Sequence, residues 1–249
     1  MTMISLTSYI SPDARIGRNV EIAPFVYIGS DVEIGDDCEI MPYTSVLSGT
    51  TLGRGNRVFA GTILGAAPMF TEKGTHSRLI IGNDNIFREN CVITTGSHAR
   101  PTRIGNGNFT GADVSVQAGT IVENGTTIHA GCKIGERCEL KDAVLLQHMA
   151  LLDPDVRIGT LAEVSALCNV TGNVPPYMTF GGTGTRAFSL DEERLRKAGI
   201  SETAIDRLRL FCHLIRRAAV SPSDAIRRIE TKYGSCEELQ RLLKEIGHE

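Results

Sequence analysis

The chain has 249 residues, with 26 glycines, no tryptophan and only 5% aromatic residues. Its 26 Lys and Arg against 29 Asp and Glu leave a net charge of −3, which argues against a chain that mainly binds nucleic acid. It has no apolar run long enough for a membrane span and no basic, apolar leader, so we expect neither a span nor a signal peptide. Seven cysteines without a CxxC pair indicate free thiols and a cytoplasmic location.

A six-residue repeat runs through most of the chain. Hexads follow one another without a gap over residues 8–67, resume over 79–96 and continue over 102–173. The third residue of each of the 25 hexads is apolar except Thr110. Each hexad can supply one short strand with one inward side chain, and only stacking against neighbouring hexads buries that side chain. The repeat therefore predicts an all-β solenoid, a parallel β-helix.

The other places of the hexad are also patterned. The fourth residue is often glycine, which suits a corner where a Cβ would crowd the chain or where φ must be positive. First places hold small and β-branched residues and five cysteines, which indicates packing rather than chemistry: Cys38, Cys91, Cys132, Cys138 and Cys168. The two interruptions, 68–78 and 97–101, are expected to be loops that leave the coil, where binding sites often form.

The period changes after residue 177. Ser189, Ser201 and Ser221 are expected to cap helices that begin beside them, and a fourth helix is expected over 235–246. We therefore expect a β-helix over 1–185, with loops at 68–78 and 97–101, and a helical domain over 186–249. This domain has 13 Lys and Arg against 11 Asp and Glu. Its Arg pairs are either solvated surface or a docking site for an acidic partner.

Three segments add a family resemblance to the repeat. Residues 85–89 (NIFRE) look like an NxIRE motif, 174–177 (VPPY) match the end of the coil, and 196–201 (RKAGIS) resemble RRGFS. With the hexads, they make the chain similar to the UDP-N-acetylglucosamine O-acyltransferases that begin lipid A synthesis. The resemblance implies a left-handed β-helix and a homotrimer with active sites in clefts between neighbouring subunits.

Enzymes of this family move a 3-hydroxyacyl group from acyl carrier protein to the 3-hydroxyl of the sugar. The chemistry needs a general base for the hydroxyl proton and donors for the tetrahedral oxyanion. The resemblance thus implies an acyl carrier protein or coenzyme A thioester as donor and a sugar nucleotide as small-molecule partner. It implies no metal and no bound cofactor.

Several expected chemical groups are replaced in this chain. The family's catalytic histidine aligns with Ala118, and a companion histidine aligns with Ser115. Later coils carry Arg137 in place of one histidine and Asp153 in place of another. In the first loop, Gln-Asp becomes Met-Phe. The positions expected to bind substrate are Ser115, Arg137, Asp191, Lys197, Met69 and Phe70.

Three residues are candidates to replace the missing base. Asp153 lies in the same column of coils as Ala118, two coils along. His129 and His148 share one corner in adjacent coils, roughly 4.8 Å apart, and in a trimer that corner could face the neighbour's cleft. The alternative interpretation makes each of them a surface turn residue. His98, in the second loop, is a weaker candidate.

Two functions remain open at this point. The first is an acyltransferase acting on a nucleotide sugar or a related hydroxyl or amine, where a neutral amine would need less help from a base. The segment 165–167 (SAL) is bulkier than the glycine-rich segment typical of the family, which predicts a short acyl chain or none. The second is an inactive trimeric homologue that binds a sugar nucleotide or carrier protein, or modulates a true acyltransferase. The wide spacing of the histidines does not match the three-histidine zinc site of some β-helix trimers.

Overall fold

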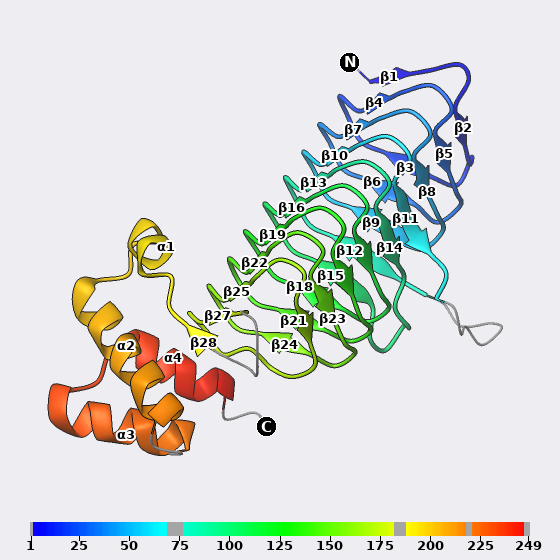
Figure 1. Cartoon of the computed structure of the whole chain (residues 1–249). Helices are drawn as coiled ribbons and strands as arrows, with labels where there is room; N and C mark the ends of the chain where they lie inside the picture. The colour runs from blue at the N-terminus through cyan, green and yellow to red at the C-terminus, as the bar shows by residue number, and fades with distance from the viewer. Residues whose placement is uncertain (1, 69–76, 182–187, 218–220, 247–249) are drawn as a thin grey trace.

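The computed structural model describes residues 2–68, 77–181, 188–217 and 221–246. It is a left-handed parallel β-helix of about 9 turns followed by four helices. In Figure 1 the coils stack into a prism, with the N-terminus at one end and the helices at the other. None of the described helices is long and apolar enough to cross a membrane.

The strands form three parallel sheets along the sides of the prism. The first sheet contains β1 (Met3–Ile4), β4 (Glu21–Ile22), β7 (Glu39–Ile40), β10 (Arg57–Val58), β13 (Ile86–Phe87), β16 (Phe109–Thr110), β19 (Thr127–Ile128), β22 (Leu145–Leu146), β25 (Glu163–Val164), β27 (Thr179–Phe180) and the antiparallel β28 (Phe188–Ser189). The second contains β2 (Tyr9–Ile10), β5 (Tyr27–Ile28), β8 (Ser45–Val46), β11 (Ile63–Ala66), β14 (Val92–Thr94), β17 (Ser115–Val116), β20 (Lys133–Ile134), β23 (Leu151–Leu152) and β26 (Asn169–Val170). The third contains β3 (Arg15–Ile16), β6 (Glu33–Ile34), β9 (Thr50–Leu52), β12 (Leu79–Ile81), β15 (Thr102–Ile104), β18 (Ile121–Val122), β21 (Glu139–Leu140) and β24 (Arg157–Ile158).

The 25 hexads correspond to the strands β2 to β26, one each, so the repeat is confirmed as the unit of the fold. The chain passes from the first sheet to the second around a first corner, and from the second to the third around a second corner. A third corner returns it to the first sheet. Paired strands are usually 18 residues apart, as in Thr127 opposite Leu145. Third-place side chains such as Ile128 and Leu146 point inward and form one continuous buried core.

Glycine at the fourth place of the hexad mostly provides space rather than backbone freedom. A Cβ on the fourth-place Gly35 would lie 2.7 Å from the carbonyl carbon of Gly53 in the next coil, so close stacking of the coils excludes a side chain there. Positive φ occurs mainly at the sixth place, where ordinary residues such as Arg137 (φ 57°) and Leu167 (φ 60°) adopt it, and at the fourth-place Gly65 (φ 88°). Apart from Gly65, the crowding explanation for the fourth-place glycines is therefore confirmed, and the one from positive φ is wrong.

A buried asparagine ladder runs along the first places of the first sheet. The Asn85 side-chain amide donates to Asn56 Oδ1 at 2.9 Å and to the Gly105 carbonyl at 2.9 Å. Its own Oδ1 accepts from the backbone N and the Nδ2 of Asn108, at 2.9 and 3.0 Å. The first residue of the NIFRE segment is thus fully used in holding three coils together. Its neighbours in that segment, Arg88 and Glu89, form an ion pair at 2.9 Å.

First-place cysteines occupy the same position and make the same type of contact as first-place threonines. The Sγ of Cys132 donates to the Gln147 carbonyl at 3.1 Å, and Cys138 to the Asp153 carbonyl at 3.2 Å. Thr120 Oγ1 likewise donates to the Gly135 carbonyl at 2.8 Å. The expectation that these cysteines serve packing is supported by their burial and by the absence of disulfides among the described residues.

This burial predicts which thiols resist alkylation. Desolvation raises the pKa of Cys91 and of Cys138 to about 11, so at pH 8 only about one thiol in a thousand is a thiolate, the reactive form. In the native protein, iodoacetamide should leave both unlabelled while it modifies the half-buried Cys236. Labelling of all three in urea is the control, measured by peptide mass spectrometry. Equal native rates at Cys91 and Cys236 would contradict the placement.

The helical part begins later than expected. Helix α1 spans Glu192–Lys197 and is capped by Asp191, whose carboxylate accepts from the Arg194 backbone N at 3.0 Å, so the prediction of Ser189 as the cap is wrong. Helix α2 spans Glu202–Arg217, α3 spans Pro222–Tyr233 and α4 spans Glu237–Ile246. Ser201 and Ser221 accept backbone N–H groups at the starts of α2 and α3, as predicted. The expected domain boundary after residue 185 lies outside the described residues.

Two charged side chains attach the helices to the coil. Arg194 is half-buried and donates to the carbonyls of Leu161 at 2.9 Å and Ala143 at 2.7 Å, and desolvation lowers its pKa. The Glu245 carboxylate accepts from the backbone N and the hydroxyl of Thr160, at 3.1 and 2.9 Å. Tyr177, at the end of the VPPY segment, is buried in the helical core. The coil end and the helices are therefore one packed unit.

Candidate functional site

The second corner contains the position of the missing histidine. Ser115 begins β17 and Ala118 follows in the turn, both half-buried. The Ala118 carbonyl accepts from the backbone N of Arg137 in the next coil at 2.9 Å. Ala118 supplies no group that can take a proton, and the altered site stays a prediction.

Two arginines enclose this corner. Arg137 donates two hydrogen bonds to the carboxylate of Asp155, at 2.8 and 2.7 Å, and a third to Glu136 at 3.0 Å. Hydrogen bonding to Asp155 raises the pKa of Arg137 above its usual range. Arg100, from the loop 97–101, donates to the carbonyls of Gly119 at 3.0 Å and of Arg137 at 2.8 Å. Both arginines beside Ala118 are therefore held by partners.

The candidate base on the second corner, Asp153, lies apart from the two histidines. Asp153 is half-buried in the turn after β23, on the second corner. His129 follows β19 and His148 follows β22, which places both on the first corner. The structure thus groups two of the three candidate bases and leaves Asp153 apart from them.

The two histidines are in direct contact. Their Nδ1 atoms lie 3.3 Å apart, and the rings meet edge to face with centroids 4.5 Å apart and planes at 84°. His129 is half-buried and His148 is exposed. Burial and the neighbouring His148 lower the pKa of His129, while Glu163 acts in the opposite direction. His129 therefore favours its neutral form.

Ladder bonds make the position of this pair well defined. The backbone N of His129 donates to the Leu146 carbonyl at 2.9 Å, between paired strands. Beside the rings, Gln147 donates to the Glu163 carboxylate at 3.1 Å. The sequence marked the two histidines through their hexad places. It did not mark Gln147, Glu163 or Arg100, whose side-chain partners come from other coils.

The expected tail residues have structural partners. Asp191 caps α1, and the exposed Lys197 pairs with Glu193 at 2.7 Å. Met69 and Phe70 lie outside the described residues. The partners of Asp191 and Lys197 thus come from α1, and neither residue is paired with the histidines or with Ala118.

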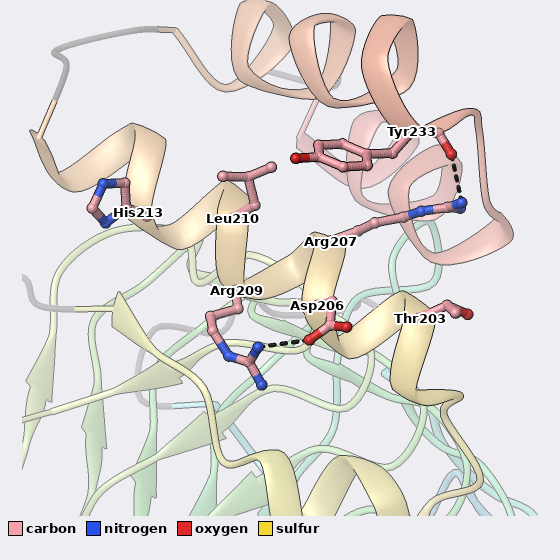
Figure 2. Close-up of a pocket in the computed structure, with 7 residues that line it drawn as sticks. All are labelled: Thr203, Asp206, Arg207, Arg209, Leu210, His213 and Tyr233. Carbon is pink, nitrogen blue, oxygen red and sulfur yellow. Dashed lines mark hydrogen bonds and ion pairs between the residues drawn. The ribbon is translucent and has the colours of Figure 1, made fainter.

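The helices also form a groove of about 600 Å³, drawn in Figure 2. Arg207 points toward α3 and donates to the Tyr233 and Ser235 carbonyls, at 2.7 and 3.1 Å, at the end of that helix. Arg209 is paired with Asp206 at 2.6 Å and Glu192 at 2.8 Å. Both cations of the groove are already engaged, so it is not an obvious anion site. Its lining residues are Thr203, Asp206, Arg207, Arg209, Leu210, His213 and Tyr233.

Known proteins share the whole of this architecture. Residues 173–249 match the family model described as UDP-N-acetylglucosamine O-acyltransferase, domain 2. A Myxococcus xanthus protein named acyl-(acyl-carrier-protein)–UDP-N-acetylglucosamine O-acyltransferase is 36% identical, over 99% of this chain and 96% of its own length. An Anaeromyxobacter protein with the same name is 32% identical, over 78% of this chain and 77% of its own.

A solved structure agrees with these sequences. The structure of LpxA, a UDP-N-acetylglucosamine acyltransferase from Bacteroides fragilis, superposes with a TM-score of 0.94 at 32% identity, over 99% of this chain and 97% of that one. The similarity includes both the coil and the helices, with almost no unmatched length on either side. The chain therefore belongs to the UDP-N-acetylglucosamine O-acyltransferase family.

Proposed function

We propose that this protein transfers an acyl group from a carrier-protein or coenzyme A thioester to a hydroxyl or amine of a nucleotide sugar, with the His129–His148 pair as the base. The names of its relatives support the donor and acceptor classes. The observation that carries the proposal is the 3.3 Å contact between the two Nδ1 atoms. It matters because Ala118 occupies the position that aligns with the family's catalytic histidine. The reaction belongs in the cytoplasm and in lipid A synthesis.

The contact determines which ring nitrogens carry hydrogen atoms. In a neutral pair, one Nδ1 must carry hydrogen and the other must accept it. Because His129 is more buried and favours neutrality, we assign the Nδ1–H to His148 and the accepting Nδ1 to His129. His148, which is exposed, then has a basic Nε2, and His129 has an Nε2–H that can donate.

This arrangement suits acyl transfer. His148 Nε2 takes the proton of the acceptor's hydroxyl or amine while the oxygen or nitrogen of that group bonds to the thioester carbon. The imidazolium that forms strengthens the hydrogen bond to His129, because a charged donor bonds more strongly. The tetrahedral intermediate then collapses, the carbon–sulfur bond breaks and the thiolate receives the proton from His148. His129 Nε2–H is available to a developing negative oxygen.

Exposed aromatic rings near the N-terminal end of the coil support a homotrimer, and Phe25 and Tyr43 among them lie on the first corner, several coils before the histidine pair. Phe25 stacks on Tyr43 with ring centroids 5.3 Å apart, and Tyr9 stacks on Tyr27 at 5.2 Å, and all four rings are exposed in the single chain. Exposed apolar patches of this kind mark protein contacts. A neighbour packed here would place its own surface against the first corner and enclose the histidine pair in a cleft between subunits.

The same corner limits the acyl chain. Beyond the histidines, the exposed Met149 and Leu167 project from adjacent coils, where a glycine-rich segment would leave a groove. We therefore propose a short acyl group. The exposed Arg227 and Arg228 on α3 supply a basic surface for an acidic carrier protein, a contact that added salt should weaken.

The experiment is mass-spectrometric detection of product from UDP-N-acetylglucosamine and its 3-amino analogue, with acyl carrier protein and coenzyme A donors of several lengths. We expect product with a short acyl chain from the wild-type protein. The variant Ala118→His tests the alternative of an inactive homologue. Activity in that variant alone would mean a cleft that has lost only its base. Tight binding of the sugar nucleotide with no turnover in either protein would favour a binding role.

A further inference from the structure

The distance within the histidine pair also matches the spacing of two ligands on a metal ion. Zinc–imidazole bonds are about 2.0–2.1 Å long and the usual arrangement is tetrahedral, which puts two ligand nitrogens about 3.3–3.4 Å apart. The two Nδ1 atoms are 3.3 Å apart. The same distance therefore fits either an N–H···N bond between the rings or one cation held by both nitrogens.

We propose that His129 and His148 bind one borderline divalent cation, such as Zn²⁺, through their Nδ1 atoms. Imidazole suits zinc, copper and nickel rather than magnesium or calcium. His148 is exposed, so a cation in solution can reach the pair. The strands that carry the rings, β19 and β22, are paired through Ile128 and Leu146, which fixes the two backbones before any cation arrives.

The part of the chain that the structure describes supplies two ligands at this site. Glu163 lies close enough to influence His129, but its carboxylate accepts a hydrogen bond from Gln147 at 3.1 Å. Within the described ranges, no group of three or more His, Cys, Asp or Glu residues could hold a metal ion. Water or a substrate group completes the coordination shell, and the cation exchanges readily.

Binding of a cation also removes the basic nitrogen of the pair, a consequence for catalysis that rests on the proposed function. A cation needs both Nδ1 lone pairs, so the hydrogen on His148 Nδ1 must move to Nε2. Each neutral ring then carries its hydrogen on Nε2, and no basic ring nitrogen remains. Zinc is therefore an inhibitor of acyl transfer rather than a cofactor for it.

Equilibrium dialysis of the full-length protein against Zn²⁺, with metal analysis, tests the site directly. We expect one zinc per wild-type chain. Because outer-shell partners alone change metal affinity 10–100-fold, removing a ligand in His129→Asn or His148→Asn should weaken binding more than tenfold. His98→Asn and His213→Asn remove exposed imidazoles elsewhere and should bind as the wild type does. Circular dichroism of each variant checks that the coil is folded.

A spectroscopic probe separates this site from other weak sites. Co²⁺ in a four-coordinate site absorbs strongly in the visible range, and the band should disappear in both ligand variants and persist in both controls. Unchanged zinc binding in His129→Asn would overturn the proposal while leaving acyl transfer untouched. A second outcome is that both ligand variants lose zinc binding while neither zinc nor the substitutions change acyl transfer. That result would support the metal site and contradict the role of the pair as the base.

Discussion

His148→Asn should lower kcat for acyl transfer by about 10²–10⁴-fold, the usual contribution of a general base. Asparagine keeps an amide N–H at the position of the imidazole Nδ1 and removes the Nε2 that takes the acceptor proton. The contact with His129 can therefore persist while the base is lost. Since KM depends on contacts that this substitution leaves in place, most of the loss should appear in kcat.

His129→Asn is the matched partner of this variant. Its amide oxygen can still accept from His148 Nδ1, so the orientation of the base survives and only the Nε2–H donor disappears. We expect a smaller loss, about tenfold. Product formation by mass spectrometry gives both rates, with His213→Asn as the control because that imidazole is exposed on α2. Wild-type rates in both His148→Asn and His129→Asn would exclude the pair as the base.

The hexad pattern predicted most of the coil because each repeat contacts mainly its neighbours. One inward residue in every six is a local signal that needs no knowledge of distant contacts. N-cap residues are local signals too, and they predicted Ser201 and Ser221 as caps. This type of signal failed at α1 because Ser189 lies in β28, which pairs with β27, and Asp191 is the first polar residue free to cap the helix.

The candidate site was predictable only where hexad places carry the geometry. The hexad places of His129 and His148 put them on the same corner in adjacent coils, which was enough to predict that they lie close together. Arg100 was not predictable, because the loop that carries it has no place in the repeat and its partners, the carbonyls of Gly119 and Arg137, are backbone groups. A carbonyl is present at every residue, so composition and spacing give no sign of which one a loop side chain will reach.

The asparagine ladder shows the same limit and predicts the largest loss of stability. Asn85 is 0% exposed, and Asn85→Ala leaves the Gly105 carbonyl and both the backbone N and Nδ2 of Asn108 without their partner. Asn56 Oδ1 keeps only the backbone N of residue 85. An unsatisfied buried polar group costs about 1–3 kcal/mol, so the free energy of unfolding should fall by about 3–5 kcal/mol. Nothing in a hexad count marks this residue, because first places accept threonine, valine and cysteine equally well by size.

A surface position with the same bonds is the control for Asn85→Ala. Asn124 Oδ1 accepts from the backbone N and Nδ2 of Asn106, both at 2.9 Å, and its own amide donates to Asp142 at 3.0 Å. Because Asn124 is exposed, water can replace the lost partner, and Asn124→Ala should cost about 1 kcal/mol or less. Urea unfolding at one fixed protein concentration compares the two, since assembly would make stability depend on concentration. Equal losses would mean that the number of hydrogen bonds, rather than their burial, sets the stability of the coil.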